Sequence, residues 1–240
     1  MIFRNLENFL SWDSWFLLFK PLQNSEFTNS KKWIPIIPPK DRIWADPFIV
    51  KKNNLRYIFF EEYINIKSKG HISFFILDKE NNIEGPFKAI EEKYHLSYPM
   101  VFSFEEKLYM IPASRNGSTH IYESIKFPFI WSPVKKIVED KIGTDSTFLQ
   151  YNNKFWIFTS MPSNINSGDK VLKIYHAKSP TDKWTSFKGN IEIEDIFNSR
   201  SAGNFFWKNG SLYRPSQDCS KIYGGAVTIN KVLSFSDELY

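Results

Sequence analysis

The sequence predicts an all-β fold, a five-bladed β-propeller built from short antiparallel strands. Three observations predict it: a repeat of aromatic apolar runs, a composition that favours strands, and the lack of a sustained helical stripe. Aromatic residues make up 18% of the 240 residues, and 23 of them are Phe, which suits strands better than helices. No segment keeps an apolar stripe at helical spacing over three turns.

One pattern occurs four times along the chain. A small or acidic residue starts an apolar run, and a second run opens on an aromatic residue soon afterwards, beyond a polar turn. The repeats start 47 to 57 residues apart, and self-similarity near this period is typical of propeller blades. The starting residues are Asp46, Tyr98, Asp145 and Ala202, and the matching aromatics are Tyr57, Tyr109, Trp156 and Tyr213.

Each repeat predicts one blade, and the four blades are expected near residues 46–95, 98–140, 145–190 and 202–233. The first three blades are predicted to have four strands each, and the fourth to have three before the chain ends. The predicted strands are 48–50, 57–60, 71–77 and 87–90; 100–104, 108–111, 120–123 and 134–138; 147–150, 155–159, 172–176 and 184–187; and 204–206, 212–214 and 226–229.

Residues 1–45 are predicted to close the ring with strands of a fifth blade, because an open propeller exposes an edge strand at each end. Residues 12–19 and 33–37 are the candidates. The proline-rich run 34–39 predicts a surface connector and not a central strand. No linker divides the chain, so one domain spanning 1–240 is expected.

Charge and cysteine content limit the function classes. The net charge of +5 comes from dispersed lysines, which favours anionic partners such as nucleotide-sugars, phosphates or a membrane surface. Cys219 is the only cysteine, and the apolar stretch 15–19 is too short to span a bilayer. A cytoplasmic protein without disulfides is therefore expected. Nothing in the sequence indicates nucleic-acid binding.

The repeat predicts which polar residues meet at the propeller axis. The first two strands of each blade form a hairpin, so the start of the first strand and the end of the second lie at the same end of the blade. Carboxylates gathered in this way suit glycosyl transfer, in which one takes a proton and another gives one. The predicted ring contains Asp46, Glu61, Glu62, Tyr98, Ala113, Asp145, Ala202, Gln217 and Asp218.

Within this ring, Asp46 is predicted to be the catalytic base, with Asp145 and Asp218 supporting it. The simpler alternatives are a turn acid before proline for Asp46 and an Asx turn for Asp145. Side chains alternate along a strand, so at most one of Glu61 and Glu62 faces the pocket.

Two arginines are predicted to hold an anionic group of the substrate, and the further predicted substrate-binding residues are Glu61, Glu62, Tyr98 and Gln217. Arg200 and Arg214 supply paired donors for a carboxylate or phosphate, and the alternative is an arginine–aspartate pair that braces the blade. Cys219 is expected to be a small buried residue. The four histidines do not form a metal-binding set, and no cofactor motif is present.

The ordered motifs resemble one family, the five-bladed propeller domain at the N-terminus of glucosamine inositolphosphorylceramide transferases, which is also found in bacterial surface-polysaccharide loci. The resemblance covers roughly residues 40–233, and its architecture is similar to the propellers of furanosidase-type glycoside hydrolases, which place an acid where Asp46 stands. Alanine stands at position 113, where the family usually has glutamate. The motifs are Trp44–Phe48, Phe59–Tyr63, Gly70–Ser73, His95–Phe102, Tyr109–Pro112 and Arg214–Cys219.

The resemblance implies a glycosyltransferase-like enzyme of lipopolysaccharide or capsule biosynthesis that binds an anionic sugar or nucleotide-sugar. Other polysaccharide-assembly enzymes and a membrane surface are further expected partners. A non-catalytic carbohydrate-binding or scaffolding module is the alternative, favoured by Ala113. Glycoside hydrolysis is the third hypothesis, because the acid pair is incomplete.

Overall fold

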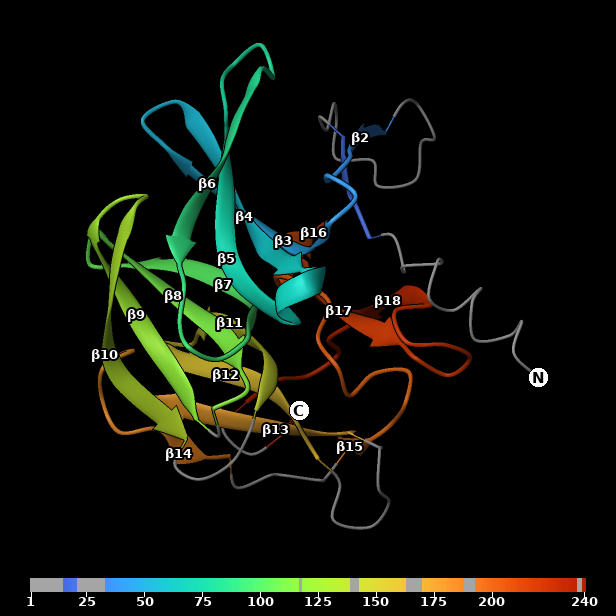
Figure 1. Cartoon of the computed structure of the whole chain (residues 1–240). Coiled ribbons are helices and arrows are strands. Elements are labelled where there is room, and N and C mark those ends of the chain that lie inside the picture. The colour runs from blue at the N-terminus through green and yellow to red at the C-terminus, as the bar shows by residue number, and fades with distance from the viewer. Residues whose placement is uncertain are drawn as a thin grey trace.

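Four antiparallel sheets surround a common centre in the computed structural model (Figure 1). The structure describes residues 15–20, 33–116, 118–138, 143–162, 170–187, 193–236 and 239–240. The first two sheets have four strands each, in the order of the chain. Their strands are β3 (Arg42–Lys52), β4 (Leu55–Ile64), β5 (Lys69–Leu77) and β6 (Ile83–Ile90), then β7 (Leu96–Phe104), β8 (Lys107–Ser114), β9 (Thr119–Lys126) and β10 (Ile130–Val138).

The third and fourth sheets continue the ring. The third has the order β11-β12-β13-β14 with the short β15 also paired to β13, and the fourth has the order β16-β17-β18. A single 3₁₀ turn, η1 (Asn65–Lys67), joins β4 to β5. The remaining bounds are β11 (Thr144–Tyr151), β12 (Lys154–Pro162), β13 (Lys170–Ala177), β14 (Thr185–Ser186), β15 (Ile193–Glu194), β16 (Phe206–Lys208), β17 (Ser211–Asp218) and β18 (Ala226–Lys231).

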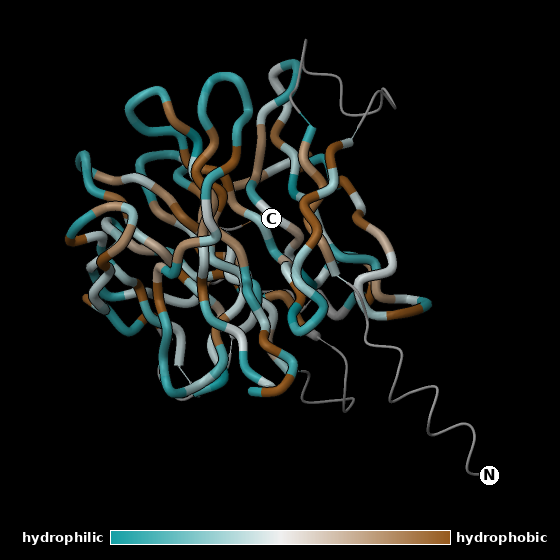
Figure 2. Tube along the Cα trace, turned by 45° about the horizontal axis from the view of Figure 1, so that its top comes forward, coloured by the Kyte–Doolittle hydropathy of each residue, from teal (hydrophilic) through white to brown (hydrophobic). Residues whose placement is uncertain are grey.

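The polar turns of the repeat form tight hairpins between the first two strands of each sheet. In all four hairpins the two turn residues have positive φ, for example 50° and 63° at Asn53 and Asn54. Two successive positive φ angles define the hairpin turn whose twist matches that of the strands, and asparagine and glycine tolerate it best. The hairpin turns are therefore local sequence features. Figure 2 shows their hydrophilic tips at the edge of the molecule and hydrophobic strands inside it.

Aromatic side chains fill the spaces between neighbouring sheets. Phe48 of the first sheet meets Tyr98 of the second edge-on, with ring centroids 4.8 Å apart. Phe102 of the second sheet stacks on Phe148 of the third at 3.8 Å. Aromatic pairs of this kind add stability beyond their buried area, and others lie within a single sheet, such as Phe60 and Phe75.

The prediction of five blades is wrong for the described residues, which form four. The two N-terminal strands, β1 (Leu17–Phe19) and β2 (Ile34–Ile36), instead make a separate two-stranded sheet. Pro35 has no N–H to donate, and Pro38 and Pro39 follow directly, so β2 cannot extend into a long ladder. Residues 1–14 and 21–32, which belong to the predicted closing segment, lie outside the described residues.

The two-stranded sheet lies between the first and fourth blades. Leu17 and Phe19 pack into the core of the first blade beside Trp44, and the Trp44 backbone N–H donates to the Trp15 carbonyl at 3.2 Å. On the other side the Trp15 ring lies 6.2 Å from that of Tyr223, in the loop before β18. No helix among the described residues is long and apolar enough to cross a bilayer.

Candidate functional site

A bulge in the first strand of three blades aims side chains at the axis. At Asp46, Tyr98 and Asp145 the pairing register shifts, so that two residues lie opposite one. All three have positive φ, between 46° and 54°, which is an unfavourable backbone region for residues with a side chain. Such strain persists only where the surroundings impose it, and it gathers at functional sites. The repeat therefore places the same strained position in each of three blades.

These bulges surround a cavity of about 790 Å³ at the axis. All four blades and the β1 segment contribute to its wall. Of the nine residues to which the sequence assigns a catalytic or substrate-binding role, six line it and three do not. Those lining it are Asp46, Glu61, Tyr98, Asp145, Arg200 and Gln217.

Asp46 is a half-buried carboxyl in this wall. Burial and the nearby charge of Asp145 raise its pKa to about 7, although Arg200 and a backbone hydrogen bond from Tyr98 act in the opposite direction. A carboxyl that titrates near neutral pH can both take and give a proton. Asp46 is thus the group in the cavity best placed to change its charge under ordinary conditions.

Asp145 is held by two donors from the fourth blade region. It is 2% exposed, and its Oδ2 accepts hydrogen bonds from Arg200 Nε and, at 3.1 Å, from Gln217 Nε2. Gln217 also donates to the Ser201 carbonyl at 2.9 Å. Arg200 therefore has features of both predicted roles. It forms an arginine–aspartate pair that braces one blade against another, and it also lines the cavity.

Glu61 is the second cavity carboxyl with a raised pKa. Burial raises it first, and the charges of Asp46 and Asp145 add to the effect. Its Oε1 lies 3.4 Å from His95 Nε2, and His95 Nδ1 accepts a hydrogen bond from the Gly70 backbone N–H at 2.9 Å. Because Nδ1 accepts, Nε2 carries the hydrogen of the neutral ring.

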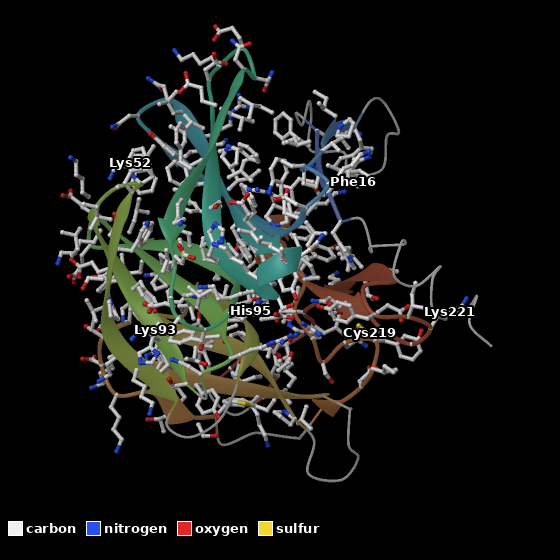
Figure 3. The ribbon with its side chains drawn as sticks, viewed as in Figure 1. Phe16, Lys52, Lys93, His95, Cys219 and Lys221 are labelled. Carbon is white, nitrogen blue, oxygen red and sulfur yellow. The ribbon has the colours of Figure 1, made fainter. Side chains whose placement is uncertain are left out.

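The surroundings of His95 keep its ring neutral. Burial, followed by the charge of Arg115, lowers the pKa of His95 to about 4. Gly70 leaves the room that this arrangement needs, since a Cβ there would lie 2.7 Å from the Leu96 carbonyl oxygen and 2.8 Å from Glu61 Oε1. Figure 3 shows His95 near the centre of the molecule.

Glu62 lies on the opposite face of β4 and does not line the cavity. Its carboxylate accepts hydrogen bonds from Arg42, Trp44 and Ser73 and lies 3.1 Å from His71 Nε2. Burial raises its pKa, but these donors outweigh burial and lower it to about 2. Glu62 is a buried structural anion of the first blade. This position does not fit the predicted role in substrate binding, because the side chain lies on the face of β4 that is turned away from the cavity.

Arg214 and Asp218 also lie away from the cavity. Arg214 is 2% exposed and donates to the carbonyls of Asn198 and Ser199 and to Ser201 Oγ, so it braces the segment that leads into the fourth blade. Asp218 accepts a hydrogen bond from the Ser220 N–H at 2.9 Å and closes a turn at the end of β17. The proposed roles in anion binding and catalysis do not fit these positions.

Tyr98 combines a place in the cavity wall with a structural task. It is 2% exposed, and its hydroxyl oxygen lies 2.8 Å from Thr147 Oγ1 and accepts the Gly203 N–H at 2.7 Å. These contacts join the second blade to the third and to the segment before the fourth. The hydroxyl that the sequence assigns to substrate is therefore already bonded.

Sequence reasoning missed several residues of the cavity wall. His95 and Arg115 lie just outside the predicted ring positions, and Tyr223 and Trp15 come from a loop and from the N-terminal segment. Arg200 lies over the Tyr223 ring at 4.7 Å. The one signal in the sequence was the position of His95 at the start of a family motif. No group of three or more potential metal ligands occurs among the described residues.

Comparison with known proteins identifies the family. The sequence profile of the N-terminal part of glucosamine inositolphosphorylceramide transferase 1 matches residues 36–240. The protein of that name from Oryza sativa subsp. japonica is 33% identical over 201 residues, which cover 82% of this chain and 27% of the relative. Its Arabidopsis thaliana counterpart is 31% identical over 201 residues, 82% of this chain and 26% of the relative.

The chain is also similar in fold to solved structures of enzymes that act on carbohydrates. An exo-β-1,3-galactanase from Phanerochaete chrysosporium with galactose has a TM-score of 0.67 at 13% identity, over 86% of this chain and 52% of that one. An exo-1,5-α-L-arabinanase from a bovine ruminal metagenomic library has a TM-score of 0.63 at 13% identity, over 88% and 85%. At such identities the likeness shows the β-propeller fold alone.

The family assignment depends on the sequence matches, which cover most of this chain. The chain spans about a quarter of the length of the curated relatives that it matches. It belongs to the family of the N-terminal domain of glucosamine inositolphosphorylceramide transferase 1.

Proposed function

We propose that the axial cavity binds a sugar and takes part in its transfer, with Asp46 as general base and Glu61 as proton donor. The observation that carries this proposal is the meeting of two carboxyls of raised pKa in one cavity, next to a third that is paired with Arg200. Burial, together with the repulsion between like-charged neighbours, raises the pKa values of such acid–base pairs.

In the proposed reaction Asp46 accepts the proton of an acceptor hydroxyl while that oxygen attacks the anomeric carbon of the sugar. The bond from the anomeric carbon to the leaving oxygen breaks, and this oxygen takes the proton of Glu61. Asp46 ends protonated and Glu61 ionised, so the charge of the pair is unchanged, and exchange with solvent restores the starting state. General acid–base catalysis of this kind contributes roughly 10²- to 10⁴-fold in rate.

Glu61 serves as the proton donor in this proposal, because Ala113 stands where the family usually has a glutamate. Both residues stand four places after the repeated aromatic of their blade, Tyr57 and Tyr109, and both line the cavity. A carboxyl from the first blade therefore supports the chemistry where the second blade has none. Ala113 remains the observation that favours the second candidate function, a non-catalytic sugar-binding module.

Arg115 is the arginine of the cavity wall that lies outside the Asp145 ion pair, and it is placed to contact an anionic group of a sugar or nucleotide-sugar. Arg214 does not reach the cavity, and Arg200 is already paired with Asp145, so these two arginines offer no free anion site at the centre. The relatives are named as transferases and come from plants, and their names contain no surface polysaccharide. The proposal therefore extends to sugar transfer and omits lipopolysaccharide and capsule.

The test is a transfer assay with a panel of nucleotide-sugars and hydroxyl acceptors, beside calorimetric titration of the same compounds. Asp46→Asn and Glu61→Gln are expected to lower turnover by about 100-fold or more while binding persists. Glu123→Gln is the matched control, because Glu123 pairs with Lys107 on the outside of the second blade. Sugar binding without turnover in the unmodified chain would favour the binding module, and unchanged turnover in Asp46→Asn would refute the catalytic assignment.

A further inference from the structure

A second cavity lies at the hairpin between β3 and β4 of the first blade. Its volume is about 580 Å³, which is within the range of small-ligand sites. The hairpin residues 51–56 form most of its wall, and Lys79, in the turn after β5, completes it. Figure 3 shows Lys52, one of the lining residues, at the margin of the molecule and away from His95. We call this hollow the basic cavity.

The described residues that line the basic cavity include four cations and no acid. The two acids that flank Lys79 in the chain, Asp78 and Glu80, do not line it. The Asp78 carboxylate instead accepts hydrogen bonds from the Asn82 backbone N–H at 2.8 Å and from the Asn82 side-chain amide at 2.7 Å. The cavity therefore has an excess of positive charge, which attracts anions. Its cations are Lys51, Lys52, Arg56 and Lys79.

Two of these cations stand directly opposite each other in the hairpin. Lys51 is the partner of Arg56 in the pairing of β3 with β4, and opposed residues of an antiparallel pair carry their side chains on the same face of the sheet. Like charges in such a pair are destabilising. An anion bound between the two side chains would offset this repulsion, so the pair favours an anionic ligand.

Contacts with neighbouring segments hold two of the four cations in place. Arg56 is half-buried and donates a hydrogen bond from Nη2 to the Asp78 carbonyl oxygen. Its guanidinium carbon lies 5.9 Å from the centre of the Phe19 ring. The Lys52 ammonium lies 5.0 Å from the centre of the Phe127 ring, in the second blade. Cations that are fixed beforehand lose less conformational freedom when a ligand binds.

We propose that the basic cavity binds a phosphoryl group. A phosphoryl group carries up to two negative charges and three acceptor oxygens, which match several cations better than a single carboxylate does. A guanidinium can bind two of these oxygens at once, while each ammonium acts as a point charge. A soluble phosphate ester and a phospholipid headgroup offer this same chemistry. The inference depends on the basic cavity alone and not on the proposed sugar transfer.

Calorimetric titration of the full chain with inorganic pyrophosphate tests the proposal, beside flotation with phosphatidylcholine vesicles that contain or lack phosphatidic acid. We expect binding that weakens with salt and a loss of about tenfold or more in Lys51→Ala/Lys79→Ala. The matched control is Lys178→Ala/Lys183→Ala, which removes the same charge at two exposed positions between β13 and β14. This control is expected to bind as the unmodified chain does.

A third variant separates the basic cavity from the axial cavity. Arg115→Met removes the arginine of the axial wall that lies outside the Asp145 ion pair, and is expected to keep the binding at the basic cavity.

The two arms of the experiment identify the source of the phosphoryl group. Binding of pyrophosphate that only Lys51→Ala/Lys79→Ala weakens supports the proposal with a soluble ligand. Binding to phosphatidic acid vesicles alone, with the same dependence on these lysines, supports it with a lipid headgroup. No binding in either arm, equal losses in the two lysine variants, or a loss confined to Arg115→Met would each overturn the proposal.

Discussion

Glu61 and Glu62 are neighbours on one strand and lie in opposite environments. Glu61 faces the axial cavity, where burial and two other carboxylates raise its pKa. Glu62 faces the interior of the first blade, where four donors hold its pKa at about 2. Two adjacent positions on one strand thus hold a carboxyl whose pKa is raised and a carboxylate that stays ionised down to about pH 2.

The comparison shows that the carboxyl that stabilises the first blade and the carboxyl proposed for catalysis lie on opposite faces of β4. The Glu62 carboxylate accepts hydrogen bonds from buried donors that would otherwise lack a partner, so it stabilises the blade. The acid at Glu61 is surrounded by groups of its own charge, so its ionisation costs stability. The two arginines also differ: Arg214 is enclosed by carbonyl groups, whereas Arg200 pairs with a cavity carboxylate. A fold that keeps such a strained site sacrifices stability there.

The largest expected effect comes from replacing each of the two glutamates by glutamine. Glu62→Gln removes the anion that Arg42, His71 and Trp44 share, and should lower the free energy of unfolding by about 3 kcal/mol, because buried donors lose their partner. Glu61→Gln should leave stability at pH 8 unchanged or raise it. Urea unfolding at pH 8 measures both, and equal losses would contradict the assigned faces of β4.

Replacing either arginine should lower stability by a similar amount, but only Arg200 should affect the cavity carboxyls. Arg214→Met removes donors from the Asn198 and Ser199 carbonyls and from Ser201, and is expected to cost about 2 kcal/mol. Arg200→Met leaves the buried Asp145 carboxylate with Gln217 as its remaining donor, so it is expected to cost about as much, and it should raise the pKa of Asp46 further, because Arg200 counteracts that rise. Urea unfolding gives the first comparison and carboxyl titration the second. If Arg214→Met raised the pKa of Asp46 as much as Arg200→Met does, the assigned roles of the two arginines would be wrong.

A further expected effect is on the pH dependence of folding. The pKa of Asp46 is higher in the folded protein than the ordinary value of 3.8, so the folded state binds more protons between about pH 4 and 7. Stability contributed by this group is therefore present below pH 4 and falls as the pH rises to 7. Asp46→Asn should flatten that fall. Thermal unfolding from pH 5 to 8 checks this, and identical slopes would be evidence against the shift.

Much of the fold could be predicted from the sequence, because a repeat places the same strand and turn in every blade. All fifteen strands predicted in the four repeats overlap observed strands, although 204–206 meets β16 only at Phe206. The number of blades could not be predicted in the same way. The N-terminal strands lie outside the repeat, and prolines interrupt the second of them.

The site was predicted in outline and not in its roles. Repeat positions brought Asp46, Asp145 and Gln217 to the axis, since equivalent positions share one radius. They could not decide which of Glu61 and Glu62 faces inward, because the bulge at Asp46 shifts the pairing of β3 against β4. His95 lies in the connection between blades, where no repeat position indicates it. Its role follows only from its contact with Glu61.

Carboxyl titration by ¹³C nuclear magnetic resonance tests the central claim most directly. The account predicts one carboxyl that titrates near pH 7 and disappears in Asp46→Asn, beside a second that stays ionised down to about pH 2 and disappears in Glu62→Gln. If every carboxyl of the folded chain titrated between pH 3 and 5, the axial cavity would hold ordinary solvated acids. The proposed acid–base site would then not exist.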